Sequence, residues 1–488
     1  MKRLYNFIAV LSLIVLSSCN NFLDMQPTNA SNSGDAIATP SDAKVIINGI
    51  MRTMTSSSYY GRNFIMYGDT KGGDLTIASQ GRGLDGMYTF NHSATSGSYS
   101  GFWATGYNCI LQINNLLENI AKIATNGSTD YDKYKGEALT LRALVYFDLV
   151  RLYGLPYNYN KTSYGVPLVT KTLEASAQPT RASVEEIYKQ ILKDLTAGAT
   201  LLAENKKQEN GYIGYYGNIA EQARVKLYME DYDGALTASQ EIINSGAFTL
   251  YTPENWVASW GKQFGSESIF ELAMYSNEAD LGTSSLGYYL MCEGLKSGAA
   301  GWFMASDYFL NRLSEDPTDV RWGVMGQDES EKVHLGSCYK YMGGADLTGD
   351  GKDSPTAVNV KVIRLSEIYL IAAEASLHAS TPDAAGAASY LNKIRCRAPQ
   401  LLPATASTVS DDMILDERSK ELFGEGQRFF DMIRKNKSIT YDDEFGGIAV
   451  TQRTKTIDRT FGKIVLPISQ DEINANKALS AEQNEAYK

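Results

Sequence analysis

The stretch from Ile414 to Asn436 brings together side chains that could carry out acid–base chemistry. Carboxylates and arginines alternate along it, at Glu417, Arg418, Glu421, Glu425, Arg428, Asp431 and Arg434. Pairs of carboxylates are the groups that hydrolyse glycosidic bonds in many enzymes. Acids at i, i+4 spacing with arginines between them are also typical of structural ion pairs between packed helices. We favour the ion pairs and keep a lipid-anchored hydrolase with paired carboxylates as the alternative.

These groups need a helix to hold them in place. Apolar residues recur through the stretch at helical spacing, at Leu415, Leu422, Phe429 and Ile433. Gly424 and Gly426 interrupt the pattern, and each would cost about 1 kcal/mol in a helix interior. We therefore predict that the helix bends there, or that another backbone comes close enough to exclude side chains.

Two short motifs could bind a cofactor or a metal. Gly81-x-Gly83-x-x-Gly86 matches the dinucleotide fingerprint, but no strand pattern precedes it and no clear helix follows it, so we reject it. The motif Asp346-x-Thr348-x-Asp350-Gly351 begins like a calcium loop. Its twelfth position is Ala357 instead of a bidentate Glu. A polar turn is the favoured interpretation, and calcium at Asp346, Thr348 and Asp350 is a weak candidate.

Other chemistry finds little support in the composition and the spacing. No zinc-ligand spacing connects the three histidines, His92, His334 and His378. No Ser-His-Asp or Cys-His set can be nominated from the order of the residues. A formal net charge of −11 argues against a surface that follows nucleic-acid phosphates. We expect no cofactor, no catalytic residue and no nucleic-acid partner.

The N-terminus is organised as an export signal. Lys2 and Arg3 precede the apolar residues 4–16, which are too few to span a bilayer comfortably. Leu16-Ser17-Ser18-Cys19 then resembles a bacterial lipobox, in which cleavage exposes Cys19 for lipidation. A secretory signal with an incidental cysteine is the alternative. Because no later segment is apolar enough to span a bilayer, the lipobox predicts a chain anchored to a membrane without crossing it.

Four more cysteines are scattered along the chain without a C-x-x-C spacing, at Cys109, Cys292, Cys338 and Cys396. An even number in an exported protein permits disulfides. Isolated cysteines on apolar helical faces are more often buried free thiols, and this is the state that we predict.

The rest of the chain reads as pairs of helices interrupted by irregular segments. Ala220 to Ile243 contains two helices around a break at Asp231–Gly234, and Arg364–Leu377 followed by Pro382–Arg397 repeats the arrangement. Small residues lie where the paired helices would touch, as in tetratricopeptide repeats. We predict a mainly α fold, a tetratricopeptide-like helical-repeat scaffold with long irregular loop insertions and a few short strands.

This pattern divides the chain into successive parts. We predict a signal peptide at 1–18, a lipidated tether at 19–40, a helical part at 41–248 with a binding-loop insertion at 59–101, a mixed loop-rich insertion at 249–361 and a C-terminal helical part at 362–488.

Aromatic residues are dense in the two irregular segments. Flat rings flanked by amides and carboxylates can hold sugar rings, or the side chains of an extended peptide, by stacking and hydrogen bonding. For any single ring, core packing is the commoner role. As ligand contacts we nominate Tyr288, Tyr289, Trp302 and Trp322 in the second segment and Asp69, Asp74 and Arg82 in the first.

Taken together, the motifs resemble the SusD/RagB family of nutrient-binding outer-membrane lipoproteins. The matching segments run in order along the chain: Cys19 with Phe22-Leu23-Asp24, Glu137-x-x-x-x-Arg142-Ala143, Tyr153-Gly154-x-Pro156, Arg364-Leu365-Ser366-Glu367, Leu391-Asn392-x-Ile394-Arg395, Glu417-Arg418-x-x-Glu421-Leu422, Glu425-Gly426-x-Arg428 and Leu466-Pro467-Ile468. The tail departs from the family, because Asn484-Glu485-Ala486-Tyr487 stands where Asn-Pro-Gly-Tyr is common.

The resemblance implies a role in nutrient uptake and polysaccharide utilisation. Such a protein is expected to sit on the outer membrane, facing the cell surface, as a lid over a SusC-like TonB-dependent transporter. It would capture an oligosaccharide, deliver it to the transporter and perform no chemistry. The same lid serving peptides, as in the RagB-like branch, is the first alternative, and a pure assembly scaffold is another. The acidic balance of the chain mildly favours neutral or cationic ligands.

Overall fold

The computed structural model describes residues 37–77, 84–97, 99–124, 128–274, 282–291, 301–328, 334–341, 358–441 and 454–488. Several predictions from the sequence lie outside these ranges. They concern the signal peptide and most of the tether, and the residues Cys19, Arg82, Cys292, Asp346, Thr348 and Asp350.

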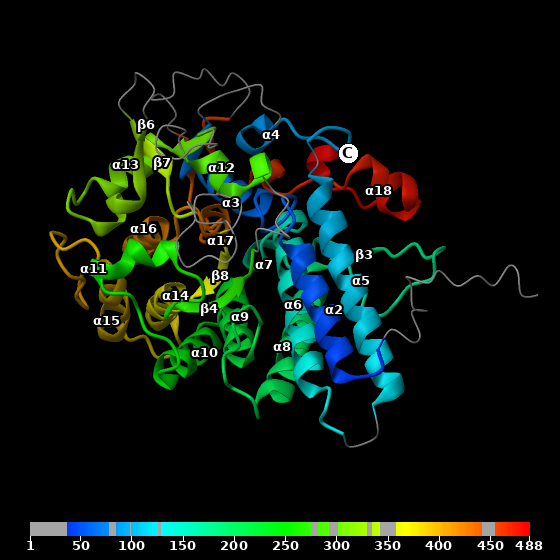
Figure 1. The fold of residues 1–488 in the computed structure, drawn as a ribbon. Helices are drawn as coiled ribbons and strands as arrows, with labels where there is room; N and C mark the ends of the chain where they lie inside the picture. Colours follow the sequence, from blue (N-terminus) through cyan, green and yellow to red (C-terminus); the bar gives the residue numbers. More distant parts are fainter. Residues whose placement is uncertain are drawn as a thin grey trace, which may run out of the picture.

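Eight helices form an array in which each helix contacts the next (Figure 1). In order they are α2 (Pro40–Met54), α5 (Ser100–Ile123), α6 (Asp132–Tyr153), α8 (Val184–Leu202), α9 (Tyr215–Tyr228), α10 (Tyr232–Ser245), α14 (Leu365–His378) and α15 (Ala384–Arg395). The array runs from α2 and α5 on the right of Figure 1 to α15 on the left. Helices close in sequence are also close in space, as the tetratricopeptide-like prediction requires.

The two helical pairs read from the sequence are confirmed. Helices α9 and α10 flank a short break and pack together, as do α14 and α15. Helix α8 begins with a capping box, in which the Ser183 hydroxyl accepts a hydrogen bond from the Glu186 backbone and the Glu186 side chain accepts one in return.

Shorter elements cover one end of the array, at the top of Figure 1. The helices among the remaining elements are α3 (Asn63–Gly72), α4 (Asp85–Tyr88), α7 (Tyr157–Asn160), α11 (Pro253–Trp256), α12 (Leu286–Leu290), α13 (Asp307–Leu313), α16 (Asp411–Leu422), α17 (Arg428–Arg434) and α18 (Gln470–Ala475). The strands of the described residues form five antiparallel pairs: β1 (Leu75–Ile77) with β5 (Phe303–Ala305), β2 (Tyr164–Pro167) with β3 (Arg181–Ser183), β4 (Ser268–Leu272) with β8 (Val360–Arg364), β6 (Met325–Asp328) with β7 (His334–Cys338), and β9 (Ile439–Thr440) with β10 (Thr456–Ile457).

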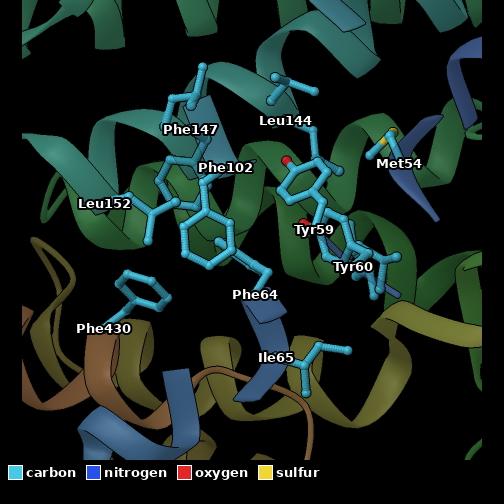
Figure 2. Packing of buried hydrophobic residues seen from close by; sticks show 14 of the residues in the cluster. Met54, Tyr59, Tyr60, Phe64, Ile65, Phe102, Leu144, Phe147, Leu152 and Phe430 are labelled. Atoms are coloured by element: carbon cyan, nitrogen blue, oxygen red, sulfur yellow. The ribbon is translucent and has the colours of Figure 1, made fainter. Parts of the chain in front are cut away.

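The expectation of irregular structure throughout 59–101 is wrong for α3. Every residue of this helix from Phe64 to Gly72 is buried. A helix that is buried on all sides has no polar face, so its sequence lacks the 3.6-residue period that reveals surface helices. Figure 2 shows Phe64 close to Phe102 of α5 and Phe430 of α17, and its ring centroid lies 5.9 Å from that of Phe430.

The chain before α3 is fastened to the helical array by a buried carboxylate. The hydroxyls of Tyr59 and Tyr60 both donate hydrogen bonds to Asp148 on α6, and the Tyr60 bond is 2.8 Å long. Arg151 completes the charge balance through an ion pair of 2.5 Å with the same carboxylate. Tyr59 and Tyr60 therefore fix the position of the chain that leads into α3.

The stretch from Ile414 to Asn436 is two helices, α16 and α17, with a sharp turn between them. Gly424 and Gly426 both have φ of +78°, in the left-handed region that favours glycine. A Cβ atom on Gly68 of α3 would lie 2.0 Å from the Gly426 carbonyl oxygen, and one on Gly426 would lie 2.7 Å from the Ile65 Cα. Both predicted possibilities therefore occur, a bend and a close backbone approach.

The described cysteines form no disulfide. Cys109 and Cys338 are buried free thiols, as predicted. The prediction of burial is wrong for Cys396, which is exposed because it follows the end of α15 on the outer surface.

Replacing Gly426 with alanine tests the close approach of α3. The new Cβ would require both a strained left-handed backbone and a clash with Ile65, so we expect the free energy of unfolding to fall by at least about 2 kcal/mol. Urea denaturation followed by circular dichroism measures the change. Gly246→Ala is the matched control, because φ there is +65° and nothing lies within 4 Å of the added Cβ. Equal losses in the two variants would contradict the role of the approach.

Candidate functional site

The carboxylates of α16 and α17 are buried ion-pair partners. Glu421 accepts a hydrogen bond from Arg364 at 2.5 Å and one from the Trp256 indole at 3.2 Å, and it forms an ion pair with Arg397 at 2.8 Å. Arg364 also pairs with Glu425, at 2.8 Å. The structural ion pairs that we favoured from the spacing are therefore confirmed.

These ion pairs determine the protonation state of the acids. Burial alone would raise the pKa of Glu421, but the guanidiniums of Arg397, Arg364 and Arg321 hold the pKa well below its usual range. A general acid must hold a proton near neutral pH, and a general base must reach the proton that it removes. Since Glu421 is held ionised by the arginines and its side chain is fully buried, it is suited to scaffolding and not to proton transfer.

Asp69 and Asp74 belong to the same interior, which corrects their nomination as ligand contacts. Each side chain is 1% exposed. Asp74 accepts a hydrogen bond from Ser419 at 2.6 Å and pairs with Arg312 at 3.3 Å. Burial, followed by the charge of Asp74, raises the pKa of Asp69 to about 7. The sequence suggested that both residues lie in an open loop. Both are covered instead, because α3 and the residues that follow it are buried.

Three of the nominated aromatic residues do come together, and we call them with Arg62 the aromatic cluster. Tyr288 and Tyr289 are neighbours on α12, whose start is fixed by Ser285 accepting a hydrogen bond from the Tyr288 backbone. Their ring centroids are 5.6 Å apart at an interplanar angle of 70°. Tyr289 is 7% exposed, whereas Tyr288 is half-buried.

Trp302 reaches the cluster from a different element. It directly precedes β5, which pairs with β1, and its backbone N–H donates to the Tyr289 carbonyl at 2.9 Å. Its ring meets that of Tyr289 edge to face at 4.9 Å and that of Tyr288 at 6.0 Å. Edge-to-face pairs of this kind hold the rings in defined orientations.

Arg62 is a member of the cluster that the sequence did not reveal. Its guanidinium lies 4.8 Å from the centre of the Tyr289 ring, and it donates to the Ser284 carbonyl at 3.1 Å and to the Asn63 side chain at 2.8 Å. Burial lowers the pKa of Arg62. Arg62 lies in an aromatic run of the predicted binding-loop insertion at 59–101. That position is the signal from which the sequence could have suggested Arg62 as a site residue.

Trp322 occupies a separate place. It lies on the 3₁₀ turn η3 (Val320–Val324), is half-buried, and donates its indole N–H to the Asp316 carbonyl at 3.2 Å. Among the described residues, no ring contact joins it to the aromatic cluster.

The cluster can therefore stack against a flat ligand, with a guanidinium close by. In the described part of the chain, no group of three or more His, Cys, Asp or Glu side chains could hold a metal ion. Within the same ranges, no helix has both the length and the apolar character that a membrane crossing would need.

Comparison with known proteins decides the family. A family model described as "SusD family" matches residues 314–487, and one described as "Starch-binding associating with outer membrane" matches residues 21–216. The structure of a SusD superfamily protein from Bacteroides thetaiotaomicron is 33% identical, with 90% of this chain and 99% of that chain covered and a TM-score of 0.80. The chain belongs to the SusD family.

Other SusD-like proteins are similar over almost the whole chain. A putative sugar binding protein from Bacteroides vulgatus is 29% identical, covers 93% of this chain and 100% of its own, and has a TM-score of 0.83. SusD-like protein P38 of Formosa agariphila is 25% identical over 92% of this chain and 95% of its own length. The family resemblance and the tetratricopeptide-like fold are thereby confirmed.

Many residues of the SusD-type motifs in the described part of the chain are buried inside this fold. Arg142 forms an ion pair with Asp194 at 2.7 Å, which joins α6 to α8. The divergent tail also contributes, because the Asn484 amide donates to the carbonyls of Tyr153 at 3.0 Å and Leu466 at 2.7 Å. The motif residues thus hold elements together, while the aromatic cluster lies outside the quoted motifs.

Glu137 is a motif carboxylate without adequate partners, and it makes a pH-dependent prediction. Neither of its oxygens has a hydrogen-bond partner, and burial raises its pKa to about 8, opposed by the charge of Lys133. Between about pH 5 and 8 the folded state holds a proton that the unfolded chain releases. The free energy of unfolding should therefore fall as the pH rises through this window.

Glu137→Gln should reduce this loss by up to about 1.4 kcal/mol per pH unit. Urea denaturation at pH 5, 6, 7 and 8 measures the slope, and the exposed Glu204→Gln serves as the control. A slope in Glu137→Gln as steep as that of the parent protein would contradict the assignment.

Proposed function

We propose that this SusD-family protein is a cell-surface lipoprotein that captures an oligosaccharide and delivers it to a SusC-like TonB-dependent transporter. The aromatic cluster is the observation that carries the proposal. Tyr288 and Trp302 are half-buried, and the ring of each packs against the ring of Tyr289. Sugar rings bind to such platforms through their C–H faces, and their hydroxyls need nearby polar groups.

The surroundings of the cluster agree with a carbohydrate. Arg62 places its N–H donors beside the rings. Rings held by short elements on a helical scaffold cost little conformational entropy when a ligand binds. The similar protein from Bacteroides vulgatus is itself described as a putative sugar binding protein.

Binding without turnover is the mechanism that fits the charges best. The carboxylates that suggested a hydrolase in the sequence pair with arginines inside the scaffold. Delivery then depends on a partner, for which the family suggests a SusC-like transporter. A peptide ligand would use the same rings, and it is the alternative that the binding test separates.

The Trp302→Ala variant tests the proposed site. Loss of a stacking platform should weaken binding of a cognate oligosaccharide by about 1–3 kcal/mol. Isothermal titration calorimetry against panels of neutral oligosaccharides and of peptides identifies the ligand class. Trp322→Ala is the matched control, since it removes the same side chain away from the cluster and should leave the affinity unchanged.

Three results would overturn this proposal. Binding to peptides alone would replace the glycan role by the peptide role. Conversion of a bound oligosaccharide during prolonged incubation would favour a hydrolase, and equal affinity of Trp302→Ala and the parent protein would move the site elsewhere.

The lipid anchor makes a separate prediction. Cys19→Ala removes the thiol that would be acylated, so the protein should leave the outer-membrane fraction and become releasable in soluble form. Fractionation of cells, with labelling by palmitate, measures both effects. Cys396→Ala is the control, because it replaces an exposed cysteine of the folded body. Unchanged membrane retention and labelling in Cys19→Ala would contradict the lipobox.

A further inference from the structure

A groove lies between the α7–β2 region and the C-terminal segments. Its volume is about 410 Å³, and none of its lining residues belongs to the aromatic cluster. One wall comes from residues 159–164, and the other comes from residues 459–462 and 483–486. Segments far apart in the sequence therefore form one surface.

Two tyrosines line the groove with unusually open rings. Tyr159 is 44% exposed and Tyr164 is 45% exposed, while most large rings of the protein are buried. Tyr164 is backed by the Arg181 guanidinium, which lies 5.4 Å from its ring centre. Arg181 is itself held by the backbone carbonyls of Gly165 at 2.7 Å and Tyr153 at 2.8 Å. The Tyr164 ring is thus supported from behind and available in front.

Arg459 adds a cation to the same groove. Its guanidinium lies 5.5 Å from the centre of the Tyr159 ring. Its Nε atom is covered and has no hydrogen-bond partner, and within the described ranges Arg459 has no ion pair. Glu485, the acid that lines the groove, is paired with Lys488 at 2.5 Å. Arg459 thus forms no ion pair within the described residues. Its neighbour Asp458 bonds to Thr460 instead, and the pKa of that carboxyl is lowered first by the hydrogen bonds from Thr460 and then by the charge of Arg459.

We propose that this groove is a second carbohydrate site and that it takes an acidic sugar residue. The sugar's carboxylate or sulfate ester binds the Arg459 guanidinium, whose planar fork suits either group. The sugar ring stacks on Tyr159 or Tyr164. The choice of a carbohydrate rests on the proposed glycan-binding function, whereas the acidic group follows from the charge of the groove.

For binding in this groove, the charge of Arg459 matters more than the negative net charge of the whole chain. A net charge of −11 acts over the entire surface, but salt screens exposed charges beyond about 8 Å under physiological conditions. A contact with Arg459 inside a groove is much shorter than that distance. The overall charge therefore lowers the rate of approach of an acidic polymer more than it lowers the strength of the final contact.

Affinity gel electrophoresis of the mature protein tests the proposal. The gels contain polygalacturonate, alginate, chondroitin sulfate or carrageenan, with galactan and starch as neutral counterparts. The parent for comparison is Trp302→Ala, so that the aromatic cluster contributes little. We expect at least one acidic polysaccharide to retard the Trp302→Ala variant. Adding Arg459→Gln to this variant should weaken its association with that polysaccharide at least five-fold. Tyr159→Ala should weaken it as well.

Arg52→Gln is the matched control, because it removes the same positive charge from a half-buried position on α2. Two results overturn the second site. In one, Arg459→Gln and Arg52→Gln change the retardation equally. In the other, none of the four acidic polysaccharides retards the protein. Either result leaves the aromatic cluster untouched, since its test uses Trp302→Ala with neutral oligosaccharides. Thermal unfolding of each variant verifies that its fold is retained.

Discussion

The buried ion pairs around Glu421 are the constraint on which the rest of the structure depends. Arg364 at the end of β8, Arg397 after α15 and Arg321 on η3 all approach this one carboxylate on α16. Taking such charges out of water is costly, and removing one partner typically costs about 3–5 kcal/mol because the others are left unpaired. Elements that supply the partners must therefore arrive at the same point, which links the helical array to the C-terminal helices.

Arginine serves two different purposes in this protein, and its partners distinguish them. Arg364 and Arg434 pair with buried carboxylates and stabilise the scaffold. Both also lie over aromatic rings, as Arg62 and Arg459 do. Arg62 and Arg459 differ in that neither has an ion pair among the described residues. A guanidinium without an ion pair has N–H groups beyond its local hydrogen bonds that can bind another molecule. Each proposed ligand surface therefore contains an arginine that has no ion pair among the described residues.

The sequence predicts those parts of the fold whose signals are local. The pairs α9–α10 and α14–α15 have clear helical periods, and the acids of α16 have the spacing of ion pairs. Helix α3 has no period because it is buried on all sides, so the polar residues Asp69 and Asp74 were interpreted as part of an open loop. For the site, composition identified the aromatic segment, but the contact of Arg62 with Tyr289 is a matter of tertiary packing that no spacing encodes.

The internal position of α3 explains how the ligand surface is attached to the scaffold. Arg62 lies at the N-terminal end of this helix, and Gly68 further along it meets Gly426 so closely that neither can carry a side chain. The helix is thus held against the turn between α16 and α17, which the Glu421 and Glu425 ion pairs hold in turn. Arg62 is therefore held in a fixed position at the start of α3. Tyr288 and Trp302 belong to short elements near Arg62. Changes in those short elements can alter the ligand surface without disturbing the charges that hold the scaffold together, because the rings and the ion pairs share no residue.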